Sequence, residues 1–468
     1  MLSTLVTASC ATATESDDDQ GADDTSALAT GPQDATFDVA TLDDEAGVGA
    51  AAALPPISLQ TFFSVPLVNG TGDDALQRKV IGLVDQAPAG SHIRVALYHF
   101  THTKPAHAFV AAAKRGVHVE IVLDKQVNEL GASEGALAPI RAAAVTGDAA
   151  VDDAADDATD AAIDAADLAD GSTDPDEAAD AATAREAADT SDDTTDLAAK
   201  AVKMNSAVTI LQQGLPAGSI TFCTRGSGSC QGDHINHNKI YLFSSLSDGS
   251  KDVVIQASAN LTGFNLHNNL VISRNDEALY AGYLQTWTAL KKHTKNLNYY
   301  RSVDGAHTIA YFYPRASGDT ITSVLDNVKC SSTSKIRVTM AFFTDGRKAI
   351  ASSLAHLKHL GCDVQVLMRK AGPESSAAII KTLKDGHIKV GLYPDTHGSN
   401  IHSKYLLIDS LYDTKGKGYV HRKLVYTGSH NYTGGALRDN DETLLRVDNP
   451  TVFDAFLANW NKIRAQIP

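Results

Sequence analysis

The sequence predicts an α/β fold built from two repeated lobes that pack as a pseudo-dimer, with acidic low-complexity appendages. Its 468 residues are enough for two ordinary domains. Residues 93–125 and 336–370 each read as an apolar strand, an amphipathic helix that ends at a glycine, and a second apolar strand. This order is typical of a βαβ unit with two parallel strands, so we expect one such unit in each lobe.

Two more segments recur after the βαβ unit, in the same order in both halves. Residues 234–262 and 399–433 each hold a His-x-Lys strand, a loop and a strand that ends in Ser-x-Asn. Each half then closes with a segment whose aromatic residues have helical spacing and which ends at a tryptophan. We expect both tryptophans to pack in the core. The matched tryptophans are Trp287 and Trp460. The expected lobes span residues 57–306 and 307–468.

The acidic appendages carry more than the whole negative charge of the chain. The formal net charge is −16, and residues 11–55 and 131–205 contribute −11 and −15, which leaves +10 on the remainder. A basic body suits a partner that carries phosphate, such as a lipid headgroup, a nucleic acid or another phosphodiester. The simpler interpretation is that the appendages keep a secreted protein soluble, and the sequence leaves both open.

The second acidic stretch is an insert in the first half. The distance from the βαβ unit to the His-x-Lys strand is greater there by a net 78 residues, and the Ala/Asp-rich tract at about 131–205 accounts for it. This composition cannot form a core, so we expect a disordered or loosely helical segment. Because it is acidic and emerges near a basic site, one hypothesis is that it lies over the site as an electrostatic lid.

The start of the chain and its cysteines favour export. Residues 1–56 combine a truncated, signal-like start, small residues before Cys10 as at a bacterial lipoprotein cleavage site, and an acidic tether. The other four cysteines fit two disulfides in an oxidising compartment, and four reduced thiols are the alternative. We therefore expect a protein that is secreted or lipid-anchored in a bacterial cell envelope. The expected pairs are Cys223 with Cys230 and Cys330 with Cys362.

The second His-x-Lys strand carries a complete set of candidate site residues. His402 and Lys404 are two residues apart, so they point to the same face of a strand. Asp409 follows on that strand, and Ser429 and Asn431 end the neighbouring strand. A histidine and a lysine beside hydrogen-bond donors suit a phosphate, so we predict a site here.

The first His-x-Lys strand repeats four of these five residues. His237 and Lys239 match the basic pair, and Ser258 and Asn260 match the end of the neighbouring strand. Ser244 stands where the second copy has the aspartate. If the lobes pack symmetrically, the two sets face each other across one site.

Together these motifs resemble the signature of the phospholipase D superfamily, His-x-Lys-x4-Asp followed by Gly-Ser-x-Asn. The second copy contains every residue of it, and the first copy matches its His, Lys, Ser and Asn but has Ser244 where the aspartate is expected. The resemblance implies two phospholipase D-like lobes and cleavage of a phosphodiester through a covalent phosphohistidine. In two-lobed members the N-terminal histidine is usually the nucleophile, which implies His237 as nucleophile and His402 as acid.

The residue types support this chemistry on physical grounds. A phosphodiester is an anion, so lysine and amide donors must hold its nonbridging oxygens. One neutral imidazole attacks phosphorus, and the other, protonated, gives its proton to the leaving oxygen. Because lysines supply the positive charge, we expect no metal and no cofactor. The expected phosphate ligands are Lys239, Ser258, Asn260, Lys404, Ser429 and Asn431.

A carboxylate is expected to orient each catalytic imidazole. Glu442 is the candidate for His402, and Asn269 takes the corresponding place for His237. An amide does not stabilise imidazolium, so this arrangement favours His402 as the proton donor. His430, inside the second Ser-x-Asn motif, either lines the pocket or faces away from it.

The sequence does not decide what is attached to the phosphate. We predict a phospholipase D-type enzyme that hydrolyses phospholipid, for example phosphatidylcholine, to phosphatidic acid and free headgroup at a membrane surface. The alternatives are a secreted endonuclease on the same scaffold and a noncatalytic pseudoenzyme that binds phosphate or membranes. In each case we expect a monomer with internal pseudo-twofold symmetry.

Overall fold

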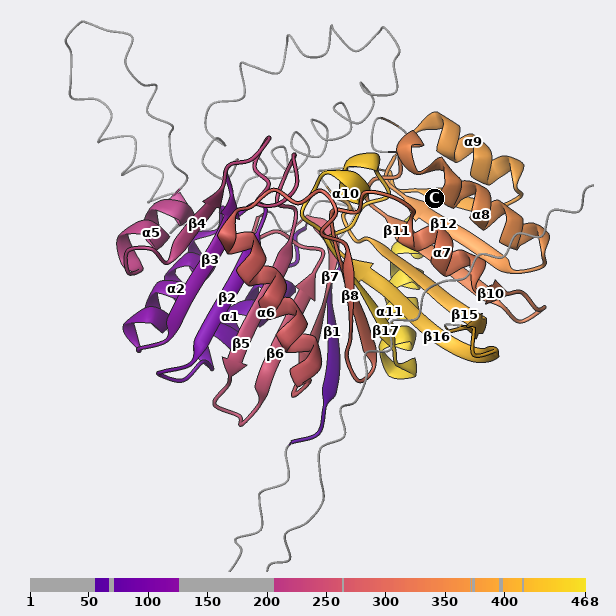
Figure 1. The fold of residues 1–468 in the computed structure, drawn as a ribbon. Coiled ribbons are helices and arrows are strands. Elements are labelled where there is room, and N and C mark those ends of the chain that lie inside the picture. The colour runs from indigo at the N-terminus through magenta and orange to yellow at the C-terminus, as the bar shows by residue number, and fades with distance from the viewer. Residues whose placement is uncertain are drawn as a thin grey trace, which may run out of the picture. The chain divides into compact units, whose positions relative to one another are not determined.

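A computed structural model describes most of the chain outside the expected appendages (Figure 1). All of these residues fall within one compact unit, and none of their helices combines the length and apolar character needed to cross a bilayer. The signal-like start, the tether and the acidic insert lie outside the described residues, so their conformations and the lid stay predictions. The described residues are 55–66, 71–125, 206–262, 265–370, 372, 375–394, 399–414 and 416–468.

The N-terminal lobe is built on a mixed sheet that contains the expected βαβ unit. Strands β2 and β3 are parallel, with Ile93 opposite Val119, and α2 connects them. Strand β4 extends the parallel part, and the other strands add antiparallel pairs beyond β2. In sheet order the strands are β1 (Ser58–Ser64), β7 (Leu266–Arg274), β6 (Lys251–Ala257), β5 (Lys239–Ser245), β2 (His92–Leu97), β3 (His118–Asp124) and β4 (Ile220–Cys223).

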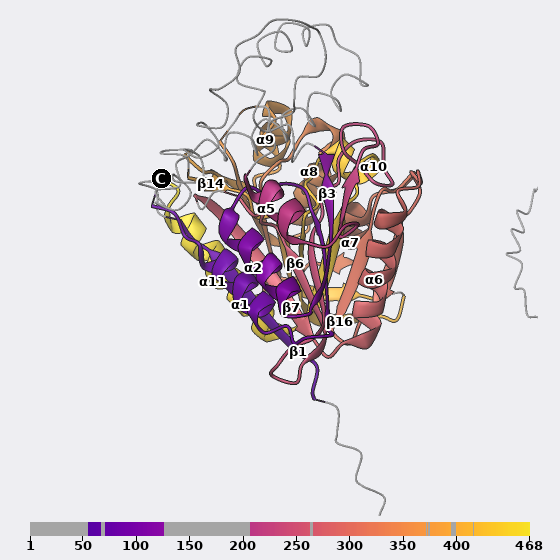
Figure 2. The ribbon, with the colours of Figure 1, turned by 90° about the vertical axis from the view of Figure 1, so that its left-hand side faces the viewer.

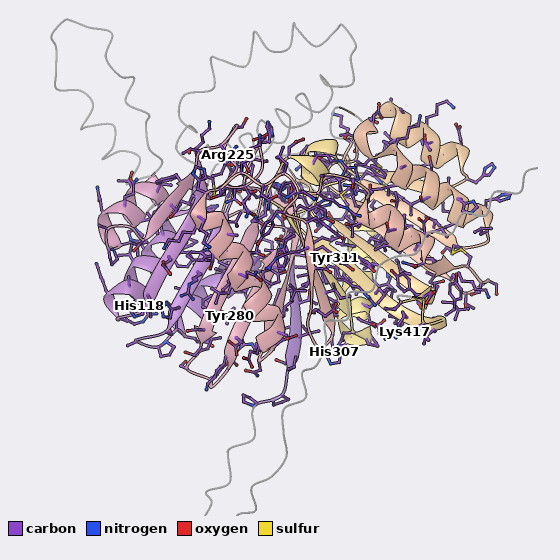
Figure 3. The ribbon with its side chains drawn as sticks, viewed as in Figure 1. His118, Arg225, Tyr280, His307, Tyr311 and Lys417 are labelled. Carbon is purple, nitrogen blue, oxygen red and sulfur yellow. A yellow bond between two sulfur atoms is a disulfide. The ribbon has the colours of Figure 1, made fainter. Side chains whose placement is uncertain are left out.

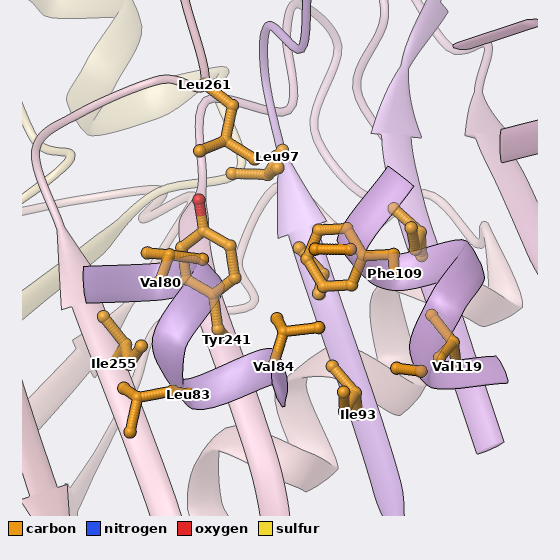
Figure 4. Close-up of a cluster of buried hydrophobic side chains, with 14 of the residues drawn as sticks. Val80, Leu83, Val84, Ile93, Leu97, Phe109, Val119, Tyr241, Ile255 and Leu261 are labelled. Carbon is orange, nitrogen blue, oxygen red and sulfur yellow. The ribbon is translucent and has the colours of Figure 1, made fainter. Parts of the chain in front are cut away.

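Three helices cover the outer face of this sheet, and one packs on its inner face. The first outer helix buries Val80, Leu83 and Val84 on one side, and Figure 4 shows them beside Ile93 of the sheet. Figure 2 looks onto this outer layer. The outer helices are α1 (Ala75–Asp85), α2 (Thr103–Lys114) and α5 (Ser206–Gly214), and the inner helix is α6 (Glu277–Lys292).

The C-terminal lobe repeats this plan. Strands β11 and β12 are parallel, with Ile336 opposite Val364, so the second βαβ unit is also confirmed. The sheet order is β13 (Lys389–Leu392), β12 (Asp363–Met368), β11 (Lys335–Met340), β15 (Tyr405–Asp413), β16 (Tyr419–Gly428), β17 (Thr443–Asp448), β9 (Thr308–Phe312) and β8 (Arg301–Asp304), with β10 (Val328–Lys329) on β15. The outer helices are α7 (Thr320–Asp326), α8 (Lys348–His359) and α9 (Ala377–Asp385), and the inner helix is α11 (Pro450–Ala465).

The inner faces of the two sheets share one apolar core that includes α6 and α11. Trp287 Nε1 on α6 donates a hydrogen bond to the carbonyl of Val95 (2.9 Å), and Trp460 Nε1 on α11 donates to that of Val338 (3.3 Å). Both tryptophans are buried, as expected from the aromatic spacing. Matching contacts in both halves confirm a two-lobed α/β fold with internal pseudo-symmetry.

Both expected disulfides form. Cys223 and Cys230 close the loop after β4, and Cys330 and Cys362 link the segment after β10 to the start of β12. The first disulfide lies beside the segment that leads into the first His-x-Lys strand, and the second lies on the outer side of the C-terminal lobe.

Candidate active site

Each His-x-Lys segment crosses to the other lobe before it enters its own sheet. The backbone N–H of His237 donates to the carbonyl of Asp441 (3.1 Å), and that of His402 donates to the carbonyl of His267 (3.1 Å). The short strand β14 (Asn400–Ile401) makes the second crossing by pairing with β7. These crossings bring both motifs between the lobes, at the end of the sheets where α10 (Gly434–Arg438) lies in Figure 1.

The imidazoles of the two His-x-Lys motifs are buried, and each has a fixed partner at Nδ1. His237 Nδ1 lies 2.7 Å from Glu442 Oε1, and His402 Nδ1 lies 2.8 Å from Asn268 Oδ1. Both acceptors are oxygens, so the proton of each neutral ring sits on Nδ1 and Nε2 keeps the lone pair. The arrangement presents Nε2 of each ring to the site.

The expected pairing of imidazoles with orienting residues was wrong in two respects. Glu442 orients His237 and not His402, because the crossing places each imidazole beside the first residues of the other lobe's strand. The amide partner of His402 is Asn268 and not Asn269. Side chains alternate along a strand, and Asn269 points the other way, where its Oδ1 accepts from Thr427 Oγ1 (2.7 Å).

The two serines of the Ser-x-Asn motifs hold these orienting residues. Ser258 Oγ donates to Asn268 Oδ1 (2.9 Å), and Ser429 Oγ donates to Glu442 Oε2. Each hydroxyl oxygen also accepts a backbone N–H from the neighbouring strand. We therefore correct the expected role of both serines from phosphate ligand to support for the side chain that orients the imidazole.

The two lysines lie beside the imidazoles. Lys239 Nζ donates to the carbonyl of His237 (2.9 Å), and Lys404 Nζ donates to that of His402 (2.8 Å). The ring of Tyr98 lies 5.3 Å from that of His237 and 5.2 Å from Lys239 Nζ. Two ammonium groups thus sit in a buried place beside two imidazoles, which is the charge distribution that a phosphodiester needs.

The two motif asparagines belong to the same region of the fold. Asn260 is half-buried and lines a cavity together with His402, and Asn431 is fully buried. The sequence did not single out Tyr98 or Asn268, although aligning the Asp-Glu-Thr of the second half with His-Asn-Asn of the first would have found Asn268. The expected residues that the structure brings together are His237, Lys239, Asn260, His402, Lys404 and Glu442.

Asp409 does not join this cluster. It lies five residues after Lys404 along β15, which is about 16 Å on an extended strand. Its Oδ1 lies 3.0 Å from His421 Nε2 on β16. In the first half, Ser244 accepts the backbone N–H of His92 (2.9 Å) at the corresponding place. We therefore withdraw Asp409 from the catalytic set, and Ser244 takes the corresponding place outside the cluster.

Burial dominates the electrostatics of the orienting carboxylate. It raises the pKa of Glu442 to about 7, against the pull of Lys239 and Lys404, which lowers it. The neighbouring Asp441 is also fully buried, and burial raises its pKa to about 6. Two carboxylates in sequence are therefore held away from water at the base of the site, where only fixed donors can stabilise their charge.

The donors that surround Asp441 come from the disulfide loop of the other lobe. The carboxylate of Asp441 accepts the backbone N–H groups of Cys230 (2.5 Å), Gln231 (3.1 Å) and Gly232 (2.9 Å), and the hydroxyl of Ser229 (2.9 Å). Figure 3 labels Arg225 on the same loop, at the end of the sheets that bears the site. The sequence predicted the disulfide but not this contact, which depends on how the lobes pack.

His430 faces an aromatic ring. Its imidazole lies 4.3 Å from the ring of Tyr313, and both are fully buried. Burial lowers the pKa of His430 well below its ordinary value, so this imidazole is neutral. His430 thus fills the second half of the site as packing rather than as a charged ligand.

Comparison with known proteins gives matches that span both halves. A family model described as "Cardiolipin synthase, PLD-like domain" matches residues 83–290 and 327–464. A curated phospholipase D of Rickettsia bellii is 25% identical over 117 residues, which cover 25% of this chain and 51% of that protein. A second, from Rickettsia typhi, is 25% identical over 111 residues and covers 24% and 48%. The chain spans about half the length of these curated relatives.

A solved structure shows the same fold over most of the chain. Phosphatidylserine synthase of Haemophilus influenzae superposes with a TM-score of 0.50 and 12% identity, covering 88% of this chain and 86% of that one. At this identity the likeness concerns the fold alone. It places the two-lobed arrangement described above among known folds.

Proposed function

Because the chain belongs to the phospholipase D superfamily of phosphodiesterases, to which the match over both halves assigns it, we propose that it hydrolyses phospholipids through a covalent phosphohistidine. The products are phosphatidic acid and the free headgroup alcohol. The observation that carries the proposal is the pair of buried imidazoles, each held at Nδ1 by an oxygen and flanked by a lysine. That pair divides the work of nucleophile and acid.

In the first step His237 Nε2 attacks phosphorus. A P–N bond forms, the P–O bond to the headgroup breaks, and His402 Nε2–H gives its proton to the leaving oxygen. The His237 ring becomes cationic as the P–N bond forms, and Glu442, at 2.7 Å from Nδ1, stabilises that charge. Among the described residues, Glu442 is the only carboxylate that hydrogen-bonds to either imidazole. It therefore faces the ring that must stay cationic for the lifetime of the intermediate.

In the second step water replaces the alcohol. His402 Nε2, now neutral, takes a proton from water, the resulting oxygen attacks phosphorus, and the P–N bond to His237 breaks. Lys239 and Lys404 neutralise the nonbridging oxygens in both steps, and the amides of Asn260 and Asn431 are the further donors. Asn268 offers His402 an acceptor without a negative charge, which favours release of its proton.

Phospholipid is the proposed substrate class for two reasons. The curated relatives carry the name phospholipase D, and the family model carries the name cardiolipin synthase. The two disulfides support action in an oxidising compartment, outside the cytoplasm, where a lipid surface is the expected partner. Secretion or lipid anchoring is part of this proposal.

A nuclease is the second candidate, because the chain outside residues 11–55 and 131–205 carries a net +10. Such a charge suits a polyanion as well as a lipid surface. A nuclease would lose affinity steeply as salt rises, because each phosphate contact releases counterions. Digestion of DNA at two salt concentrations separates this candidate from the first.

The test is turnover of phosphatidylcholine and phosphatidylethanolamine vesicles in the presence of ethanol, with and without EDTA. We expect phosphatidylethanol and phosphatidic acid in both conditions, since ethanol intercepts the same intermediate as water. His421→Ala, at an exposed position outside the site, is the matched control for variants of the catalytic histidines. Turnover of neither lipid would contradict the proposal, and would leave a nuclease or a noncatalytic binder.

A further inference from the structure

A narrow cavity opens on the His402 side of the site. It enters the N-terminal lobe between β1, α1 and the segment after β6, and His402, Asn260 and Asn268 form its inner end. The rest of its wall is mainly apolar, and Figure 4 shows three of these side chains, Val80, Tyr241 and Leu261, at one end of the core cluster. The cavity therefore connects the His402 side of the site with an apolar floor.

The size of the cavity limits what it can hold. It offers about 30 Å³ to the centres of water-sized molecules, room for about two waters or the first few heavy atoms of an alcohol. The carboxylate of Asp73 lies in the same wall and accepts the backbone N–H groups of Val65 (2.8 Å) and Ala75 (3.0 Å). A small alcohol, neutral or with a positive charge, fits these walls better than an anionic one.

Pseudo-symmetry explains why the cavity exists on this side. Ser64 lies opposite Asn268 in the N-terminal sheet. Tyr313 takes the equivalent place in the other half, since its N–H donates to the carbonyl of Glu442 (3.1 Å). Ala259 and His430 are the equivalent middle residues of the two Ser-x-Asn motifs.

Two small residues thus replace two large rings. In the C-terminal half the rings of Tyr313 and His430 pack 4.3 Å apart and fill the space beside His237. In the N-terminal half Ser64 and Ala259 leave that space open beside His402. The duplicated site is closed where the nucleophile lies and open where the acid lies.

We propose that this cavity is the alcohol site, and that Ser64, Ala259 and Val80 determine which headgroup is accepted. The proposal rests on the phospholipase function above. The leaving oxygen lies opposite His237 and within reach of His402, so the carbons bonded to it must extend beside His402. In the second step the attacking oxygen takes the same position, because it also enters opposite His237. One cavity therefore serves the leaving headgroup and the incoming alcohol.

The size and charge of the walls select ethanolamine over choline. Both begin with the same two carbons, but choline ends in a trimethylammonium group, which exceeds a cavity with room for about two waters. The carboxylate of Asp73 attracts either cation and repels the carboxylate of a serine headgroup. The proposal therefore narrows the substrate class from phospholipids in general to those with a small cationic alcohol.

The experiment compares soluble short-chain phosphatidylethanolamine and phosphatidylcholine, which removes differences between bilayers. We expect wild-type kcat/KM to favour phosphatidylethanolamine by about tenfold, the effect of a few misplaced methyl groups. Ala259→Val fills the cavity, and should lower transfer to ethanol relative to hydrolysis by about tenfold. Val80→Ala enlarges the floor, and should raise choline cleavage relative to ethanolamine cleavage several-fold. The control, Ala111→Val on the exposed side of α2, should keep both wild-type ratios.

The outcomes separate the two proposals. If the wild type cleaves both lipids but Ala259→Val and Val80→Ala leave both ratios unchanged, the cavity is not the alcohol site and the phospholipase function stands. A shift of equal size in Ala111→Val would overturn the assignment in the same way. If the wild type cleaves no phospholipid, the function fails and the alcohol site fails with it. A lower ratio of ethanol transfer to hydrolysis in Ala259→Val, together with a higher ratio of choline to ethanolamine cleavage in Val80→Ala, would support the alcohol site. Both are ratios within one variant, so they hold even if that variant is poorly stable.

Discussion

The two halves of the molecule share the elements that present histidine and lysine, and they differ in the residues that surround them. Each half crosses over, orients an imidazole through the other lobe and supports the orienting residue with a serine. The C-terminal half supplies Glu442 and the filled pair of rings, whereas the N-terminal half supplies Asn268 and the cavity. The duplicated backbone gives two equivalent imidazoles, and the proposed division into nucleophile and acid rests on these few differences.

The largest effects should come from the histidines themselves, and they should differ. His237→Ala removes the nucleophile, so turnover should fall by at least about 10⁴-fold and no phosphoenzyme should form. His402→Ala removes the acid, so it should lose turnover of lipids equally. It should still form the phosphoenzyme from an ester whose leaving group needs no proton, such as a p-nitrophenyl ester. Acid-quench trapping of the phosphohistidine tests this, and equal trapping in both variants would contradict the division of roles.

Glu442→Gln should lower kcat by on the order of 10²- to 10³-fold, because the cationic intermediate loses its carboxylate. In the wild type, burial raises the pKa of Glu442 to about 7 from an ordinary 4.5. Activity should therefore fall as pH drops through about 7, where the carboxylate gains a proton. A pH–rate profile that is flat between pH 8 and 6 would contradict this.

The same variant has an opposite effect on folding. A carboxyl group whose pKa is raised in the folded state binds its proton more tightly there, so its cost to stability is present above about pH 7 and disappears below about 4.5. Glu442→Gln should thus raise Tm at pH 8 and leave it nearly unchanged at pH 4.5. Thermal denaturation at both pH values measures this difference, and a lower Tm at pH 8 would show that the hydrogen bond with His237 outweighs burial.

The next largest effect on kcat should come from the contacts of Asp441 and His267, the residues that directly precede Glu442 and Asn268. The Asp441 carboxylate is held by the loop closed by Cys223 and Cys230, whereas the imidazole of His267 bonds through Nε2 to the hydroxyl of Tyr393 (3.0 Å). Replacing Cys223 and Cys230 by serine should free the loop and lower kcat by about tenfold, with little change in KM. Tyr393→Phe should cost less.

The other disulfide is the matched control for that change. Cys330 and Cys362 lie on the outer side of the C-terminal lobe, so their replacement by serine should lower Tm without changing kcat. Parallel kinetics and thermal denaturation of both double variants distinguish a positioning role from a structural one. Equal losses of kcat would contradict the role of the Asp441 contact.

Asn268→Asp would make the two halves more alike. A carboxylate beside His402 stabilises its protonated form, so the alkaline limb of the pH–rate profile should move to higher pH. The maximal rate should change by less than about tenfold, because the proton is held more tightly when it must be released. An unchanged alkaline limb would mean that His402 is not the acid.

The smallest effect is expected at the aspartate of the signature itself. Asp409→Asn changes the contact with His421, whose side chain is exposed, and should change kcat/KM by less than about threefold. A loss like that of Glu442→Gln would return Asp409 to the catalytic set.

The repeat made much of this predictable. Two βαβ units, two His-x-Lys strands and two terminal tryptophans recur in one chain, and local periodicity predicts each of them. The partners of the imidazoles were not predictable in the same way. A shift of one residue on a strand turns Asn269 toward the site in place of Asn268, and only an alignment of the two halves, not the local pattern of the strand, indicates that register. Whether Glu442 serves its own half or the other depends on lobe packing, a long-range property.

The crossed hydrogen bonds at Nδ1 have a consequence for how such a chain can change over time. A substitution at Glu442 is felt by a histidine that lies in the other half, and a substitution at Asn268 is felt by His402. Neither half can therefore be deleted or replaced as a unit without removing the Nδ1 partner of the histidine in the other half. The two halves must therefore evolve together, because the substitutions that one half tolerates depend on the histidine of the other.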